Sequence, residues 1–262
     1  MVTADTDPRW QALSEKYQGN WTLAMKDLFG IEATHQQEKV LLSAEIKSSS
    51  TSVAVATNGV GYIELVAVIT ILRTILYRDS RVIITGNGIG QTYLHIMRRI
   101  ECLWKKILKN EPWLDNYFEL KISKLQARTN KHLWQCKSVS YRTGKEENLA
   151  GECSENLMFI VLDASRMPER GLGTIRGTLT NSDNRILLIS IPDKNKGHFY
   201  DSQHEKLAIG PNNPRGIYTA ITLSAEDSPL VHPAYLDKKQ KEYGGRDSRD
   251  YRIKILAQFV ED

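Results

Sequence analysis

The chain has 262 residues, which is enough for one large α/β domain or two small ones, and enough to bury a substantial core. Hydrophobic residues make up 41% and charged residues 25%, an ordinary composition for a soluble globular protein. The formal net charge of +4 is mildly basic, which permits contact with nucleic acid without requiring it.

Several classes of protein are excluded by what the sequence lacks. The longest apolar run, around Tyr62–Leu76, is interrupted by Glu64 and Arg73, so we predict no membrane span. The first residues, "MVTADTDPRW", lack the basic and apolar regions of a signal peptide. The cysteines are odd in number and have no CxxC spacing, which fits a reducing compartment and suggests neither a disulfide framework nor a zinc site.

The first half of the chain alternates between helical and strand patterns. Residues 8–47 have a helical, polar-amphipathic pattern, and "SSSTS" (Ser48–Ser52) is predicted to break it. Val53–Ala56 is predicted as a short buried strand. Gly61–Tyr77 is predicted as a helix with a broad apolar face.

A second strand and helix follow, at Arg81–Thr85 and Gln91–Leu108. Residues 118–143 alternate apolar and polar, which predicts antiparallel strands or an edge hairpin. Two continuous apolar strands are expected at Asn156–Ala164 and Arg185–Pro192.

Towards the end, "GIYTAITL" precedes a polar helix, "HPAYLDKKQKEY". The alternation of strands and helices predicts an α/β fold with a mostly parallel sheet covered by helices on both faces. No linker rich in Gly, Ser or Pro divides the chain, so we expect a single domain over 1–262, with a helical segment at 1–47 and a core at 48–262.

Two stretches place a glycine loop between a strand and a helix: "VAVATNGVGYIEL" (residues 53–65) and "VIITGNGIGQTYL" (residues 82–94). The first has the layout of a phosphate-binding loop, but Tyr62 stands where such a loop carries Lys, and Ile63 where Ser or Thr holds Mg²⁺. Neither stretch has the three-glycine spacing of a dinucleotide site. Considered alone, both are also consistent with ordinary turns that need glycine for positive φ.

The order of these segments resembles the ATPase domain of tailed-phage terminase large subunits, from about Trp10 to Val260. "YQGNWTLAMKDLFGIEATHQQEKVL" is similar to the family's first segment, in which a Gln reads adenine, and Gln37 falls at that position. "SVAVATNGVG" then corresponds to the Walker A strand and loop. "SRVIITGNGIGQ" corresponds to the family's second strand, with Thr85 and Gln91 at the matching ends. The resemblance implies a P-loop NTPase-like fold.

The most specific similarity is "LAGECSENLMFIVLDASRMPE" (Leu149–Glu169). Against the family pattern, Asp163 takes the place of the catalytic Glu, and Leu162 the place of the Asp that orders Mg²⁺. No shift of the alignment restores both acids. "RILLISIP" resembles the coupling strand, with Ile191 in place of Asn. The nuclease domain that normally follows is expected to be absent, because the chain stops at Asp262. The aligned residues that match are Ala164, Ser165, Pro168 and Glu169.

These departures predict a degenerate ATP site. Phosphoryl transfer depends on positioning and charge neutralisation, and each missing group removes part of that. Tyr62 supplies no cation, and Ile63 and Leu162 supply no oxygen. Asp163 is one methylene shorter than the Glu that it replaces, and a misplacement of about 1 Å can cost about 10²-fold in rate. The nucleotide-site positions are Gln37, Ala56, Thr57, Asn58, Gly59, Val60, Gly61, Tyr62 and Ile63.

We therefore expect a terminase-like pseudo-ATPase of a bacteriophage DNA-packaging system, with no cofactor and no metal site. The alternatives are an active packaging ATPase that uses ATP and Mg²⁺ through an atypical site, and an unrelated α/β domain. The resemblance implies other terminase subunits, a portal or double-stranded DNA as partners, an oligomeric ring, and the host-cell cytoplasm as location. A set of basic residues on one predicted helix is interpreted as a solvated face or as a DNA-backbone contact: Arg98, Arg99, Lys105, Lys106 and Lys109.

Overall fold

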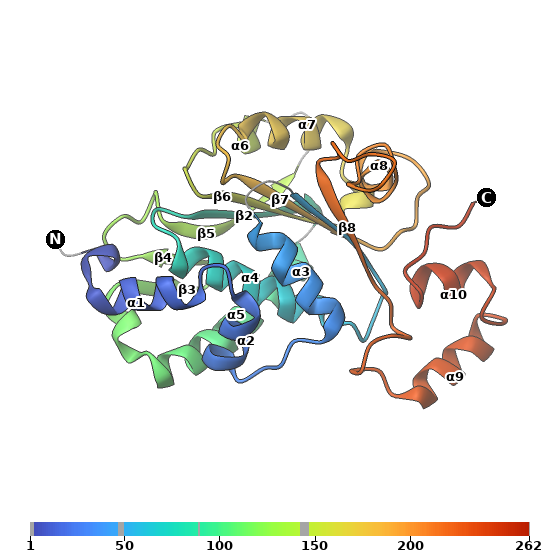
Figure 1. The fold of residues 1–262 in the computed structure, drawn as a ribbon, viewed down its shortest axis with the longest axis horizontal. Coiled ribbons are helices and arrows are strands. Elements are labelled where there is room, and N and C mark those ends of the chain that lie inside the picture. Colours follow the sequence, from blue (N-terminus) through green and yellow to red (C-terminus); the bar gives the residue numbers. More distant parts are fainter. Residues whose placement is uncertain (1–2, 47–49, 89, 142–146, 262) are drawn as a thin grey trace.

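An eight-stranded sheet forms the centre of the computed structural model, which describes residues 3–46, 50–88, 90–141 and 147–261. The strand order is β3-β4-β5-β2-β6-β7-β1-β8, and helices cover both faces (Figure 1). The six strands from β5 to β8 in this order are parallel, and β4 is antiparallel to its two neighbours, β5 and β3. The predicted α/β fold with a mostly parallel sheet is confirmed.

The strands lie where the sequence predicts them, with ends that differ by one to three residues; β6 ends at Leu162 and β7 at Ser190, two residues earlier than predicted in each case. The prediction of a break at Ser48–Ser52 is wrong for its last three residues, because β1 begins at Ser50, and its first two lie outside the described residues. The hydroxyl groups of Thr51 and Ser52 bond to Ser43 and Ser202, both at 2.7 Å, so these polar side chains are satisfied inside a buried strand. The strands are β1 (Ser50–Val55), β2 (Arg81–Asn87), β3 (Phe118–Lys121), β4 (Lys124–Ala127), β5 (Gln135–Tyr141), β6 (Leu157–Leu162), β7 (Arg185–Ser190) and β8 (Tyr218–Leu223).

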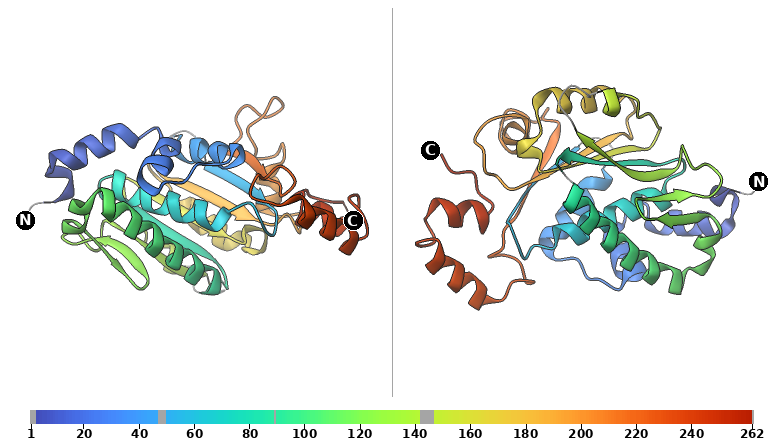
Figure 2. Two further views of the ribbon diagram at one scale, coloured as in Figure 1. Left: turned by 90° about the horizontal axis from the view of Figure 1, so that it is seen from below. Right: turned by 180° about the vertical axis from the view of Figure 1, so that it is seen from behind.

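The helices form a layer on each face of the sheet, and a pair at one end (Figure 2). One face is covered by α1 (Pro8–Tyr17), α2 (Trp21–Phe29), α3 (His35–Glu45), α4 (Tyr62–Leu76) and α5 (Gly90–Asn110). The other face is covered by α6 (Glu147–Ala150), α7 (Glu169–Thr178) and α8 (His198–Gln203). The helices α9 (Pro233–Glu242) and α10 (Arg249–Lys254) follow β8 and lie at the end opposite α1. None of the helices in the described residues is long and apolar enough to cross a membrane.

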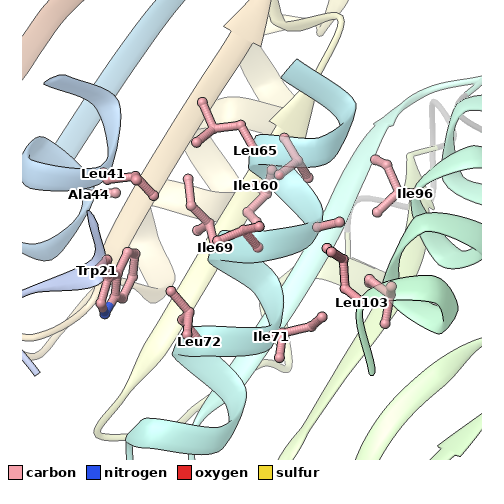
Figure 3. Packing of buried hydrophobic residues seen from close by; sticks show 14 of the residues in the cluster. Trp21, Leu41, Ala44, Leu65, Ile69, Ile71, Leu72, Ile96, Leu103 and Ile160 are labelled. Atoms are coloured by element: carbon pink, nitrogen blue, oxygen red, sulfur yellow. The ribbon is translucent and has the colours of Figure 1, made fainter. Parts of the chain in front are cut away.

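The helix α4 occupies the centre of the larger core. Every residue from Leu65 to Leu76 is buried, because α4 packs on the sheet and between neighbouring helices. Figure 3 shows α4 with Trp21 and Leu41 on one side and Ile96 and Leu103 on the other. A helix that is apolar on all sides is expected in such a position.

Side chains from distant segments satisfy the last carbonyl groups of α4, which have no partner within the helix. Trp10 Nε1 donates to the carbonyl oxygen of Ile75 at 2.7 Å, and Ser14 Oγ donates to that of Leu76 at 3.1 Å. Trp134 Nε1 donates to the carbonyl oxygen of Thr74. The amino-terminal helix α1 is therefore fixed to the central helix by hydrogen bonds as well as by packing.

Candidate functional site

The glycine loop, Thr57–Gly61, connects the carboxyl end of β1 to the first turn of α4. Gly59 has φ = 84° and Gly61 has φ = 67°, both in the left-handed region, and Gly61 caps the helix. Only glycine adopts these angles without strain, which explains the two glycines at this spacing.

Three segments far apart in sequence hold the glycine loop. Gln37 Nε2 donates to the carbonyl oxygen of Val60 at 3.0 Å, and Ser228 Oγ donates to that of Gly59 at 2.8 Å. The backbone N–H of Thr57 donates to the carbonyl oxygen of Lys254 at 2.9 Å. A Cβ atom on Gly59 would lie 2.2 Å from a methyl carbon of Val231, so this position is closed to larger residues.

The amide of Gln37, the expected adenine-reading group, is used within the protein. Gln37 is 3% exposed, and its Oε1 accepts from the backbone N–H of Thr34 at 3.0 Å in a capping box at the start of α3. Its Nε2 is bonded to the glycine loop. The neighbouring Gln36 donates through Nε2 to the carbonyl oxygen of Ser224, whereas its buried Oε1 has no partner among the described residues.

A cavity of about 30 Å³ lies where the strands β1, β6 and β7 end. Ligand sites in such sheets are found at the carboxyl ends of the strands. The cavity brings together four of the departures noted in the sequence: Tyr62, Leu162, Asp163 and Ile191. Its volume admits about one or two water molecules, whereas ligand pockets are typically about 300–1,000 Å³. The lining is completed by Val55, Thr57, Thr92, Ile189 and Ser190.

Tyr62 is partly buried and lines this cavity at the first residue of α4. Burial raises the pKa of its phenol, and the negative charge of Asp163 raises that pKa further. The hydroxyl group therefore stays neutral at physiological pH. The side chain supplies no positive charge at the position where the resemblance predicts a phosphate-binding Lys.

Asp163 is exposed and has φ = 50°, a left-handed conformation that is uncommon for a residue other than glycine. The described residues provide no hydrogen-bond partner for its carboxylate. No group of three or more His, Cys, Asp or Glu residues within the described ranges could hold a metal ion. Ile63, in the first turn of α4, lines a separate groove with Tyr62.

The sequence analysis missed a hydroxyl network at the ends of β6 and β7. Ser190 Oγ donates to Ser165 Oγ at 2.9 Å, and Ser165 Oγ donates to Asp193 Oδ1 at 2.7 Å. Arg166 forms an ion pair with Asp193 at 3.1 Å. In the sequence, Ser165 matches the family pattern and lacks the GxSxG context of a nucleophile, and no spacing indicates that it meets side chains 25 and 28 positions away.

The segment 224–231, which we call the strap, was also missed as part of the site. Ser228 and Val231 contact Gly59, and Leu230 lies near Gly61. The strap is anchored through Glu226, whose carboxylate accepts hydrogen bonds from Arg246 at 2.9–3.2 Å and from the hydroxyl group of Tyr251 at 2.8 Å. The hydrogen bond from Arg246, followed by that from Tyr251, lowers the pKa of Glu226.

Comparison with known proteins places this geometry in a family. No family model matches the sequence. A curated relative from Enterobacteria phage P7, "Probable terminase, large subunit", is 39% identical over 254 residues, which is 97% of this chain and 51% of the relative. The chain belongs to the terminase large-subunit family. This terminase homologue spans about half the length of that relative.

Solved terminase structures share the fold. The large terminase ATPase domain of Thermus phage P74-26, in a mutant form, has a TM-score of 0.67 at 16% identity, covering 90% of this chain and 98% of that one. The large terminase of another thermophilic bacteriophage, in complex with ADP, has a TM-score of 0.58 at 13% identity, covering 87% and 53%. The same protein has also been solved with ATP-γ-S. The terminase homologue therefore has the P-loop-like fold of terminase ATPase domains.

Proposed function

We propose that this terminase homologue is a non-hydrolysing relative of a DNA-packaging motor, a pseudo-ATPase that keeps the fold and binds partners through its surface. The observation that carries the proposal is the position of Tyr62. It replaces the loop Lys and lines a cavity of about 30 Å³ where phosphates and Mg²⁺ would have to fit.

The chemistry of the surrounding side chains supports the same proposal. Tyr62 is neutral, and neither Ile63 nor Leu162 has an oxygen to offer a metal ion. A lost charge-assisted hydrogen bond costs roughly 1.5–3 kcal/mol, and about 1.4 kcal/mol corresponds to a tenfold change in affinity. Two or three such losses weaken binding of Mg²⁺–ATP by several orders of magnitude.

The alternative is an active packaging ATPase with an atypical site. One observation favours it. The backbone N–H groups from Asn58 to Ile63 have no acceptor among the described residues, and free N–H groups at a helix start can bind phosphate. The second thermophilic-phage terminase was solved with ADP and with ATP-γ-S. This alternative requires Tyr62 to leave the cavity, and a cation supplied by a neighbouring copy in a ring.

Measurements of ATP hydrolysis and of nucleotide binding distinguish the pseudo-ATPase from the active ATPase. We expect purified, monodisperse protein to release no phosphate from ATP with Mg²⁺, and calorimetry with an ATP analogue to show no heat at high concentration. Hydrolysis that is abolished by Asp163→Asn would establish the alternative. The double variant Tyr62→Lys, Ile63→Thr tests the loop itself, because a gain of nucleotide binding would show that its backbone geometry is still competent.

The partners proposed for this chain follow from the family: other terminase subunits, a portal and double-stranded DNA, with assembly into an oligomer. The proposed location is the host-cell cytoplasm, where phage DNA is packaged. Co-sedimentation with a portal or with an intact terminase tests the proposed protein partners. The absence of any complex at micromolar concentration would count against them.

A further inference from the structure

A larger hollow lies beside the glycine loop, between the first turn of α4 and α5. Its volume is about 430 Å³, against about 30 Å³ for the cavity, and Tyr62 and Thr92 line both. We call it the α4–α5 groove. Its lining includes Tyr62, Ile63, Thr92, His95, Arg98 and Arg99.

The α4–α5 groove carries positive charge that the described residues do not neutralise. Arg99 is paired with the carboxylate of Glu64, so the charge without a carboxylate partner is that of Arg98. Arg98 and His95 are exposed, and no carboxylate of the described residues bonds to either. By contrast, Lys105, farther along α5, is paired with Glu101 at 2.6 Å. At the part of α5 that faces the start of α4, Arg98 is therefore a guanidinium without a carboxylate partner among the described residues.

The donors around the α4–α5 groove match a phosphate group. A guanidinium presents a planar fork of N–H groups that fits phosphate oxygens, and Arg98 offers such a fork without a carboxylate partner among the described residues. The backbone N–H groups of Tyr62 and Ile63 are additional donors without an acceptor among the described residues. Tyr62 and Thr92 line both hollows, whereas Arg98 and Arg99 line the groove and are absent from the lining of the small cavity.

We propose that the α4–α5 groove is a phosphate-binding site separate from the degenerate nucleotide cavity, with Arg98 and Arg99 as its charged residues and His95 as a further polar side chain of its lining. The proposal goes beyond the pseudo-ATPase function and does not depend on it, because the groove is open whether or not ATP is hydrolysed. The phosphate belongs either to a free ion or to the backbone of double-stranded DNA, and both present the same oxygens.

The test uses the whole chain, inorganic phosphate and a short DNA duplex. Phosphate binding is measured by calorimetry, and duplex binding by fluorescence anisotropy at several salt concentrations. Arg98→Ala is expected to weaken binding about tenfold, the loss of one charge-assisted contact, and to reduce the salt slope for the duplex by about one. Lys109→Ala is the matched control, because it removes the same charge from an exposed position on α5 outside the groove.

The two probes distinguish a site for a free phosphate ion from a site for the DNA backbone. Saturable binding of inorganic phosphate that depends on Arg98 supports a free-ion site, and duplex binding alone with the same dependence supports a backbone site. The proposal is overturned if neither probe binds, or if Lys109→Ala weakens binding as much as Arg98→Ala. Arg98→Gln, which keeps a long polar side chain, replaces Arg98→Ala if that variant fails to fold by circular dichroism.

Discussion

Gln37 has a structural use that competes with base recognition. Its side chain satisfies the backbone N–H of Thr34 and the carbonyl oxygen of Val60, so it joins the start of α3 to the glycine loop. A nucleotide base would have to displace one of these bonds to engage the same amide. The residue predicted to read adenine thus braces the glycine loop in this structure.

Replacing Gln37 tests this brace. Gln37→Ala is expected to lower the free energy of unfolding by about 1–3 kcal/mol, because it leaves two backbone groups unsatisfied in a buried place. Urea denaturation measures the change. Gln240→Ala, on the exposed face of α9, is the control and should change stability by less than about 0.5 kcal/mol. A similar loss in both variants would show that the brace contributes nothing.

Glu45 is a second residue whose surroundings matter, because they change the pKa of its carboxyl group. Burial raises its pKa from the ordinary 4.5 to about 7, although its carboxylate accepts the backbone N–H groups of Trp21 and Gly19, at 3.0 and 2.9 Å, which oppose the rise. Between these two pKa values the folded state binds a proton more readily than the unfolded state does.

The free energy of unfolding should therefore fall as pH rises from about 4.5 to about 7, through the contribution of Glu45. Glu45→Gln removes the titration and should flatten this part of the stability profile relative to the unmodified chain. Thermal melts at intervals of pH across this window measure the difference. Parallel profiles for the two proteins would contradict the assignment of the slope to Glu45.

At the scale of elements, the strap connects the glycine loop to the helices α9 and α10. Glu226 anchors the strap to Arg246 and Tyr251, while Ser228 and Val231 hold Gly59. The N–H of Thr57 is bonded to the carbonyl oxygen of Lys254 at the end of α10. Loop and helices are thus parts of one hydrogen-bonded unit, and loosening the anchor should loosen the loop.

Hydrogen–deuterium exchange measures this coupling. Arg246→Ala is expected to speed exchange in peptides that cover the strap and the glycine loop by several-fold, because the anchor of Glu226 is lost. Lys238→Ala, an exposed substitution on α9, should leave both peptides unchanged. If Arg246→Ala affects only α9 and α10, the strap does not transmit the change.

The sequence predicts elements well where one local signal decides them. The apolar runs at β2, β6 and β7, and the glycine positions that precede α4, were sufficient to predict the sheet and the loop at the ends of its strands. The strand residues Ser50–Ser52 were not predictable, because their hydroxyl groups are satisfied by partners that only the fold brings near. The strap and the Ser165–Ser190–Asp193 network could not be predicted for the same reason. Each joins residues that share no local sequence pattern.

At the scale of the whole molecule, the larger core joins segments from both ends of the chain. The cluster that contains α4 includes Trp10 and Leu13 from α1 and also Tyr251 and Leu256 from the last helix and the residues after it. Residues at opposite ends of the molecule (Figure 2) therefore contribute to one buried surface. This favours the single-domain organisation that the sequence suggests.

Trp10→Phe tests whether the chain unfolds as one unit. The substitution keeps an aromatic ring but removes the hydrogen bond to the carbonyl oxygen of Ile75, which should cost about 1–2 kcal/mol through an unsatisfied buried group. In a single cooperative unit, calorimetry shows one transition that moves to lower temperature as a whole, with far-UV and near-UV signals changing together. An early, separate transition confined to the amino-terminal helices would show instead that they form an independent unit beside the sheet.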